Sequence, residues 1–217
     1  MPFVDCANIA CGFHAGDPMT MVRAVELAAS EGKSIGAHPS LPDREGFGRR
    51  ELRLSPEELR AAFIYQIGAL AGVARAAGKE LSHVKPHGII YGMAARDMAL
   101  ATAMAEAAKV FGLTLFGMAG TFHEKAAREV GTHFVAEFFA DLSYGPTGQL
   151  IIPRTQSAVD VEKAAARLDR ALREGKVEAV DGTLLNIAFQ TVCIHSDPPN
   201  ARDVAAAMRR VLDTAQR

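Results

Sequence analysis

Short apolar runs alternate with longer segments of helical period along the whole chain. The runs expected to form strands are Val4–Ala10, Ser34–His38, Leu81–Lys85, Leu113–Gly117, His133–Glu137 and Thr191–Ile194. The segments expected to form helices are Pro18–Ser30, a helix opening at Ser55-Pro56-Glu57-Glu58, Ala94–Lys109, Phe122–Val130, Ala158–Glu174 and Ala201–Ala215. This alternation predicts an α/β fold with a parallel sheet and helical crossovers. An open doubly wound sheet and a barrel share the pattern, so the alternation does not choose between them.

Local signals place several element ends. Asp17 is a natural N-cap before Pro18, and Ser55 opens a capping box with proline at the first helical position. Gly32 and Gly78 stop the two helices that follow these caps. The segments 176–180 and 184–187 flank an Asp-Gly pair, which predicts a hairpin. The segment 138–153 is expected to be a loop.

Composition limits the classes of function. The 217 residues suit one large domain spanning residues 1–217, and the net charge of −1 gives no electrostatic case for nucleic acid or an anionic membrane. No apolar run approaches the roughly 20 residues of a membrane helix. Cys6, Cys11 and Cys193 lack metal-type spacing and are expected to be reduced, buried thiols. We therefore expect a cytoplasmic protein.

Histidines cluster at the ends of the predicted strands. Each of four histidines follows a strand by no more than a few residues: His14, His38, His87 and His195. The carboxyl ends of parallel strands lie at one edge of the sheet, and that edge carries the site in such folds. One such histidine alone is more often a hydrogen-bonded loop residue, but four predict a site. Asp17, Lys85 and Asp197 are expected beside them.

Two kinds of chemistry fit these residues. A metal site would use imidazoles with a carboxylate, and the spacing from His83 to His87 suggests one. Pro86 and Gly88 make a regular helix there unfavourable, so a metal would need dispersed ligands. The alternative is metal-free hydrolysis, in which histidine or aspartate activates water and Lys85 stabilises negative charge.

Other candidates have weaker signals. Gly46–Arg50 predicts a flexible loop whose Arg49 could bind an anion, and Arg154 is a similar candidate. Asp141 could equally be a base or a turn former. His123 and His133 are expected to be structural. The sequence contains no Walker A loop and no GxGxxG motif, so no nucleotide cradle is evident.

Several motifs resemble the 5-oxoprolinase A-subunit family, also called the LamB/YcsF lactam-utilisation family. They are ANIACGFHAGDP (7–18), GAHPSLPDREGFGRR (36–50), HVKPHG (83–88), FFAD (138–141), LIIPR (150–154) and TVCIHSD (191–197). The resemblance implies a seven-stranded (β/α) barrel-like fold of the glycoside hydrolase/deacetylase type. It also implies ATP-dependent hydrolysis of 5-oxo-L-proline to L-glutamate together with partner subunits B and C.

The chain departs from the family pattern in places. The family's first strand, of the type DLNxDxGE, is absent, so we expect the fold without it. Leu142 replaces the arginine usual after FAD, Gly92 replaces an asparagine and Ser196 replaces a glycine. A metal-dependent carbohydrate deacetylase and a non-catalytic shortened subunit are the competing interpretations.

The candidate site residues fall into two groups. The candidate catalytic residues are His14, Asp17, His38, Lys85 and His87. The candidate substrate-binding residues are Asn8, Arg49, Asp141, Arg154, His195 and Asp197. In this hypothesis an activated, phosphorylated lactam lies against Lys85 and Arg49, and ATP is used with the partner subunits. The metal requirement stays open, as does a homo-oligomer.

Overall fold

The computed structural model describes residues 1–153, 155 and 157–215. The chain forms two compact units, Met1–Val135 and Ala136–Arg217, each of which is described by itself. Arg154 lies outside the described residues.

The first unit is built on four parallel strands. They are β1 (Cys6–Ala10), β2 (Ser34–His38), β3 (Leu81–Val84) and β4 (Thr114–Gly117), hydrogen-bonded in that order. Ala7 pairs with Ile35, and His83 pairs with Thr114. Because every strand runs the same way, their carboxyl ends lie at one edge. The loops that follow β1, β2 and β3 carry the candidate residues of this unit to that edge.

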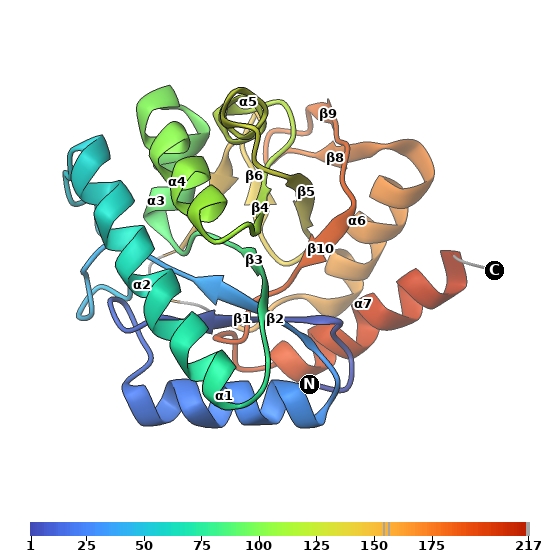
Figure 1. The fold of residues 1–217 in the computed structure, drawn as a ribbon. Coiled ribbons are helices and arrows are strands. Elements are labelled where there is room, and N and C mark those ends of the chain that lie inside the picture. Colours follow the sequence, from blue (N-terminus) through green and yellow to red (C-terminus); the bar gives the residue numbers. More distant parts are fainter. Residues whose placement is uncertain (154, 156, 216–217) are drawn as a thin grey trace. The chain divides into compact units, whose positions relative to one another are not determined.

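Helices connect these strands. They are α1 (Pro18–Ser30), α2 (Pro56–Ala76), α3 (Ile89–Ala95), α4 (Met98–Val110) and α5 (Phe122–Val130). In Figure 1 they lie outside the strands, and α2 packs against both α1 and α4. The expected caps are confirmed: Asp17 accepts from the Thr20 amide, and Ser55 and Glu58 form a capping box.

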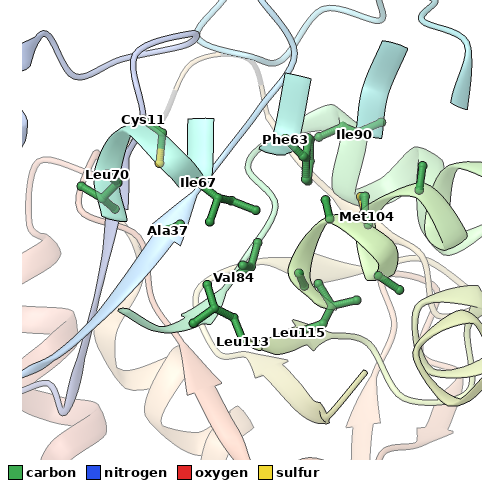
Figure 2. Packing of buried hydrophobic residues seen from close by; sticks show 14 of the residues in the cluster. Cys11, Ala37, Phe63, Ile67, Leu70, Val84, Ile90, Met104, Leu113 and Leu115 are labelled. Atoms are coloured by element: carbon green, nitrogen blue, oxygen red, sulfur yellow. The ribbon is translucent and has the colours of Figure 1, made fainter. Parts of the chain in front are cut away.

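The core of the first unit lies between the helices and the sheet (Figure 2). Phe63, Ile67 and Leu70 follow one another at helical spacing on α2, and all three are fully buried. Val84 of β3 and Leu115 of β4 face the same cluster. This packing fixes the strands on which the candidate side chains depend, because core side chains have little freedom to move.

The second unit contains a parallel pair and two hairpins. The strands β5 (Phe134–Phe139) and β10 (Thr191–Cys193) are parallel. The hairpins join β6 (Ser143–Tyr144) to β7 (Leu150–Ile151) and β8 (Lys176–Glu178) to β9 (Leu184–Asn186). The helices α6 (Val161–Glu174) and α7 (Ala201–Ala215) pack against each other. The second hairpin was expected from the Asp-Gly pair; the first was not.

The α/β class with parallel strands is confirmed, and the main error lies in one helix. The segment Ala94–Lys109 was predicted as a single helix, but α3 ends at Ala95 and α4 starts at Met98. Asp97 stops the run because its side chain accepts from the amides of Ala99 and Leu100. Residues 138–153 are not wholly loop, since they contain the β6–β7 hairpin.

Two further findings bear on the sequence-based expectations. Cys11 and Cys193 are buried as predicted, whereas Cys6 is only half-buried, and all three thiols are free. Among the described residues, no helix is long and apolar enough to cross a membrane.

Candidate active site

Three histidines meet at the carboxyl edge of the first unit. His14 lies in the loop after β1, His38 is the last residue of β2, and His87 follows β3 by three residues. Backbone hydrogen bonds extend the pairing of β2 and β3 beyond the strands, because the His87 amide donates to Pro39 O at 2.8 Å. The Ser40 hydroxyl donates to His87 O at 3.1 Å. We call these three histidines the histidine cluster.

His38 and His87 form a continuous hydrogen-bonded row between two backbone carbonyls. His38 Nδ1 lies 2.5 Å from Lys85 O, and His38 Nε2 lies 3.0 Å from His87 Nδ1. His87 Nε2 lies 2.7 Å from Phe47 O. All four ring nitrogens are therefore engaged within the protein. Burial, together with the nearby His87 and Lys85, lowers the pKa of His38 well below its usual range.

His14 completes the cluster by stacking. Its ring lies parallel to that of His87 with 3.8 Å between the centroids, and Phe47 contacts it edge-on at 5.4 Å. His14 is 3% exposed, and its Nδ1 has no hydrogen-bond partner among the described residues. Burial, then the proximity of His87 and Arg49, lowers the pKa of His14 to about 3. The ring is therefore neutral at physiological pH.

Two buried cations flank the histidine cluster. The Lys85 ammonium lies 4.8 Å from the centre of the Tyr91 ring, and the Arg49 guanidinium lies 5.2 Å from that of Phe47. Lys85 is 4% exposed and Arg49 is 9% exposed. Cations held on aromatic faces in a partly desolvated site interact strongly with an anion that reaches them. Both side chains are therefore candidates for contact with an anionic ligand or a developing oxyanion.

The segment Gly46–Arg50 is predicted to be flexible, but within the 43–50 loop the buried carboxylate of Asp43 holds it in place. Asp43 accepts from the amides of Gly46 and Arg50 at 2.9 and 3.1 Å, and the Arg50 side chain donates to it as well. Arg50 is thereby a structural residue, whereas Arg49 points to the cluster side against Phe47. Asp43 was absent from the candidate residues although it lies within the motif at 36–50.

Replacing Asp43 with asparagine should destabilise the protein by about 2–3 kcal/mol, because charge-assisted hydrogen bonds to a buried group are lost. The Arg50 side chain holds the pKa of Asp43 below its usual range. This contribution to stability is therefore present above a pH of about 4 and is lost as the pH falls through the folded-state pKa. Urea unfolding of both proteins at several pH values measures it. An equal difference in stability at every pH would contradict this account.

Phe47 has an unusual backbone conformation above the cluster. It is the one non-glycine residue with positive φ among the described residues, at +54°. Such a conformation costs about 1 kcal/mol or more and persists only where the surroundings impose it. Here the Phe47 carbonyl accepts from His87, and the Phe47 ring packs on His14 and His87. The strained residue thus fixes one end of the histidine row.

Glycines allow the 43–50 loop to approach the cluster. Gly88 has a φ of +73°, and a Cβ there would lie 2.3 Å from Gly48 O. The amide of Ile89 donates to that same oxygen at 2.9 Å. A side chain at Gly88 would therefore separate the two segments that position His87 and Phe47.

Replacing Gly88 with alanine should destabilise the protein by about 3 kcal/mol or more, because positive φ and a backbone clash act together. Gly72 is the matched control, since it is exposed in α2 and a Cβ there meets nothing within 4 Å. Its replacement with alanine should stabilise the protein by about 0.5–1 kcal/mol. Chemical denaturation measures both changes. A loss of stability in the Gly72 variant equal to that at Gly88 would remove the steric explanation.

Asn8 and His83 form a separate pair. His83 Nε2 lies 2.9 Å from Asn8 Oδ1, and its ring stacks on Phe116 with 4.2 Å between the centroids. His83 also covers Gly36, where a Cβ would lie 2.0 Å from Nε2. Burial, then Lys85, lowers the pKa of His83 to about 4. His83 fills a packed position, whereas Asn8 is exposed, and substrate binding by Asn8 stays a prediction.

Asp17, a candidate catalytic residue, has a structural role in the protein. It is exposed, and both of its oxygens accept from Thr20, one from the amide at 3.0 Å and one from the hydroxyl at 2.6 Å. The carboxylate caps α1. A catalytic role for Asp17 stays a prediction that this geometry does not support.

The second unit carries a carboxylate–histidine pair. The Asp141 side chain is 1% exposed, and it accepts from the His195 amide at 2.6 Å and from His195 Nδ1 at 3.0 Å. Accepting the Nδ1 hydrogen leaves Nε2 as the basic nitrogen. Arg167 fixes the Asp141 loop by donating to Ala140 O and Leu142 O. Asp197 is exposed.

A metal ion and a nucleotide each need a particular arrangement of side chains or backbone amides. No three of their histidine, cysteine or carboxylate side chains are arranged to hold a metal ion. The glycines of the 43–50 loop do not form a phosphate cradle. The space above Gly46 is filled by Asp43 and Arg50, and that above Gly48 by Ser40 and His87. These glycines serve packing within the chain.

Comparison with known proteins places the chain in a family. The model of the LamB/YcsF family matches residues 1–217. A protein of Thermus thermophilus, named as the A-subunit of 5-oxoprolinase, is 48% identical over 99% of this chain and 87% of its own length. The lactam utilization protein lamB of Emericella nidulans is 42% identical over 98% of this chain and 85% of its own length.

A solved structure gives the same result for the fold. The crystal structure of a lactam utilization protein from Thermus thermophilus matches with a TM-score of 0.88 and 46% identity. The match covers 99% of this chain and 87% of the Thermus thermophilus chain. The predicted fold is confirmed by this likeness, and the chain belongs to the LamB/YcsF family.

Proposed function

We propose that this chain is the A-subunit of an ATP-dependent 5-oxoprolinase, which opens the ring amide of 5-oxo-L-proline to give L-glutamate together with subunits B and C. The names of its relatives support the reaction class. The observation that carries the proposal is the pair of buried cations, Lys85 and Arg49, beside the histidine cluster. The substrate has a carboxylate, which a cation can bind. Its ring carbonyl oxygen becomes negative when water attacks, and a cation can stabilise that charge.

The chemistry assigned to the first unit is electrostatic. Attack of water on the ring carbonyl carbon places negative charge on the carbonyl oxygen. The carbon–nitrogen bond then breaks, and the ring nitrogen takes up the proton that water loses and becomes the amino group of glutamate. A preorganised cation in a site with little water stabilises that charge more than water does. Lys85 and Arg49 are proposed to supply this stabilisation. Because the aromatic rings of Tyr91 and Phe47 hold them, little reorganisation is needed during the reaction.

The use of ATP is assigned to the partner subunits. The glycines beside the histidine cluster are packed against Asp43, Ser40 and His87, so they leave no phosphate cradle in this loop. The chemistry proposed for this chain therefore uses no nucleotide held by this loop. This division of labour agrees with the A-subunit name that relatives of the chain carry.

Within the second unit, the side chain best arranged to act as a general base is His195. Every ring nitrogen of His38 and His87 already has a partner, and the Asp17 carboxylate caps a helix. Asp141 holds the Nδ1 hydrogen of His195, so Nε2 can take a proton from water. The sequence places His195 among the candidate substrate-binding residues, and its hydrogen bond to Asp141 is the reason for the different role.

The experiment measures glutamate release from 5-oxo-L-proline with ATP and purified subunits B and C, with and without this chain. We expect glutamate only when the chain is present. Release of glutamate at the same rate without it would refute the proposal. Stoichiometric binding to subunits B and C without any turnover would instead support the non-catalytic interpretation.

A further inference from the structure

The second unit contains a cleft with a basic lining. The cleft has a volume of about 300 Å³ and lies beside α6, which packs against β8. Lys163, Arg167 and Arg170 line it from α6. They are spaced by four and three residues, so they share one face of the helix. Ser143 of β6 and Glu178 of β8 also line the cleft.

The acidic side chain offsets only part of this positive charge. Arg170 Nη1 lies 2.6 Å from Glu178 Oε2, and the two form an ion pair. Among the described contacts, neither the Lys163 nor the Arg167 side chain pairs with a carboxylate. Three positive charges and one negative charge therefore leave the lining with a net charge of +2. A cleft lined mainly by one sign of charge concentrates small ions of the other sign.

The donors in this cleft favour a phosphate group over a single carboxylate. A guanidinium matches two phosphate oxygens at once, and a lysine ammonium adds a point charge. The Ser143 hydroxyl is a further donor for an oxygen of the same ligand. A phosphate group offers three oxygens or more and carries about 1.5 to 2 negative charges near neutral pH. The cleft volume of about 300 Å³ suits a ligand of this small size.

Arg167 joins the cleft to the Asp141–His195 pair. Its Nη1 donates to Ala140 O at 2.8 Å and to Leu142 O at 2.6 Å, the carbonyls on either side of Asp141. Among the described contacts of Arg167, these bonds use Nη1 alone. A guanidinium has five N–H donors, so Nε and Nη2 are left for a ligand in the cleft. A bound phosphate would therefore hold Arg167 where the two carbonyls need it.

We propose that the cleft beside α6 binds a phosphate group, and that Arg167 transmits its binding to the Asp141–His195 pair. The phosphate and the segment 140–142 would be held by different nitrogens of one planar group. Ser143 directly follows that segment, so an opening that moves the segment also removes a phosphate ligand. Binding therefore stabilises the closed arrangement of the pair. Neither the site nor the coupling rests on the proposed function, because neither involves 5-oxo-L-proline.

Phosphorus-31 NMR on the intact chain tests the binding site with inorganic phosphate at pH 7.5. We expect saturable binding with a Kd of about 1 mM, as a few charge-assisted hydrogen bonds at a solvated site provide. Acetate, which has one charge and two oxygens, should compete at least about tenfold less well. Absence of saturation up to about 10 mM phosphate would overturn the proposal. Equal competition by acetate would overturn the choice of phosphate.

Two arginines of α6 provide a matched pair of variants. Arg170 and Arg173 each pair with a carboxylate, Glu178 and Asp169 respectively. Of these two arginines, Arg170 lines the cleft. Arg170→Gln should weaken phosphate binding about tenfold, because a cation is lost and the Glu178 charge is left uncompensated. Arg173→Gln removes the same charge from the same helix and should change the Kd less than about twofold. Equal losses would mean that only the general surface charge attracts phosphate, and would overturn the site.

Hydrogen exchange at the His195 amide tests the coupling. This amide donates to Asp141 at 2.6 Å. With phosphate at about ten times its Kd, its exchange should slow about tenfold, because opening then requires release of the ligand. The Thr20 amide is the control, since it also donates to a carboxylate, that of Asp17 at 3.0 Å, and should keep its rate. An unchanged rate at His195 with phosphate bound would overturn the coupling.

The variant Arg167→Lys separates binding from its transmission. Lysine keeps the positive charge, but its ammonium lacks the planar fork that reaches the carbonyls and the phosphate together. Phosphate should still bind, with a Kd within about tenfold of that of the unaltered chain, while the slowing at His195 disappears. Full slowing in this variant would exclude Arg167 as the link and overturn the proposal. These measurements use no 5-oxo-L-proline and no partner subunit, so a negative turnover assay would refute the proposed function alone.

Discussion

Replacing Lys85 with methionine should lower the rate of glutamate formation about 100- to 1000-fold, the usual cost of removing one preorganised charge that stabilises an oxyanion. The Lys85 ammonium is buried and held 4.8 Å from the centre of the Tyr91 ring. Methionine has a similar length and no charge, so it keeps the packing while it removes the electrostatic term. The fold should therefore survive.

The chain offers a matched control for that variant. Lys125 also lies over an aromatic ring, 5.8 Å from the centre of Phe122, but it is exposed on α5. Lys125→Met should leave turnover unchanged. Because the stabilised charge exists in the transition state, the Lys85 variant should lose kcat rather than only raise KM. Equal turnover in the two variants would remove Lys85 from the scheme.

Elements whose ends are set by local chemistry were predicted closely. The helix α1 has the predicted bounds because Asp17 and Pro18 define its start and Gly32 its stop. The break between α3 and α4 was missed for the opposite reason. An alanine-rich stretch favours helix throughout, and Asp97 is ambiguous in sequence, since an aspartate inside a helix and an N-cap look alike.

The histidine cluster was foreseen in part. Strand ends place residues at an edge, which is why His14, His38 and His87 were predicted together and are found together. Sequence position does not say where a side chain points. The Asp17 carboxylate caps its own helix instead of pointing toward the cluster. Asp43 and Phe47, which build the loop beside the cluster, were not among the predicted site residues. Their roles depend on buried hydrogen bonds and a strained backbone, neither of which leaves a periodic signal.

Replacing Asp141 with asparagine should lower kcat about 100- to 10,000-fold, because His195 can then no longer act as a base although the fold is kept. Both carboxylate oxygens approach His195 Nδ1, at 3.1 and 3.0 Å, and one of them also accepts from the His195 amide at 2.6 Å. A backbone amide can only donate, so the asparagine oxygen must stay on it. The asparagine NH2 group then faces Nδ1 and favours the ring form with its hydrogen on Nε2. That form cannot accept a proton from water.

The pH profile distinguishes this effect from simple loss of structure. If His195 is the base, the acidic limb of kcat against pH seen in the unaltered chain should flatten in Asp141→Asn. Asp181→Asn is the matched control, since Asp181 is exposed in the turn between β8 and β9 and accepts only from Thr183 among the described contacts. It should keep both the rate and the profile. If the Asp141 variant has a lower rate but an unchanged acidic limb, the Asp141–His195 pair is a structural support and not the base. The base would then lie in the histidine cluster, and the hydrogen bonds of its ring nitrogens would have to break during turnover.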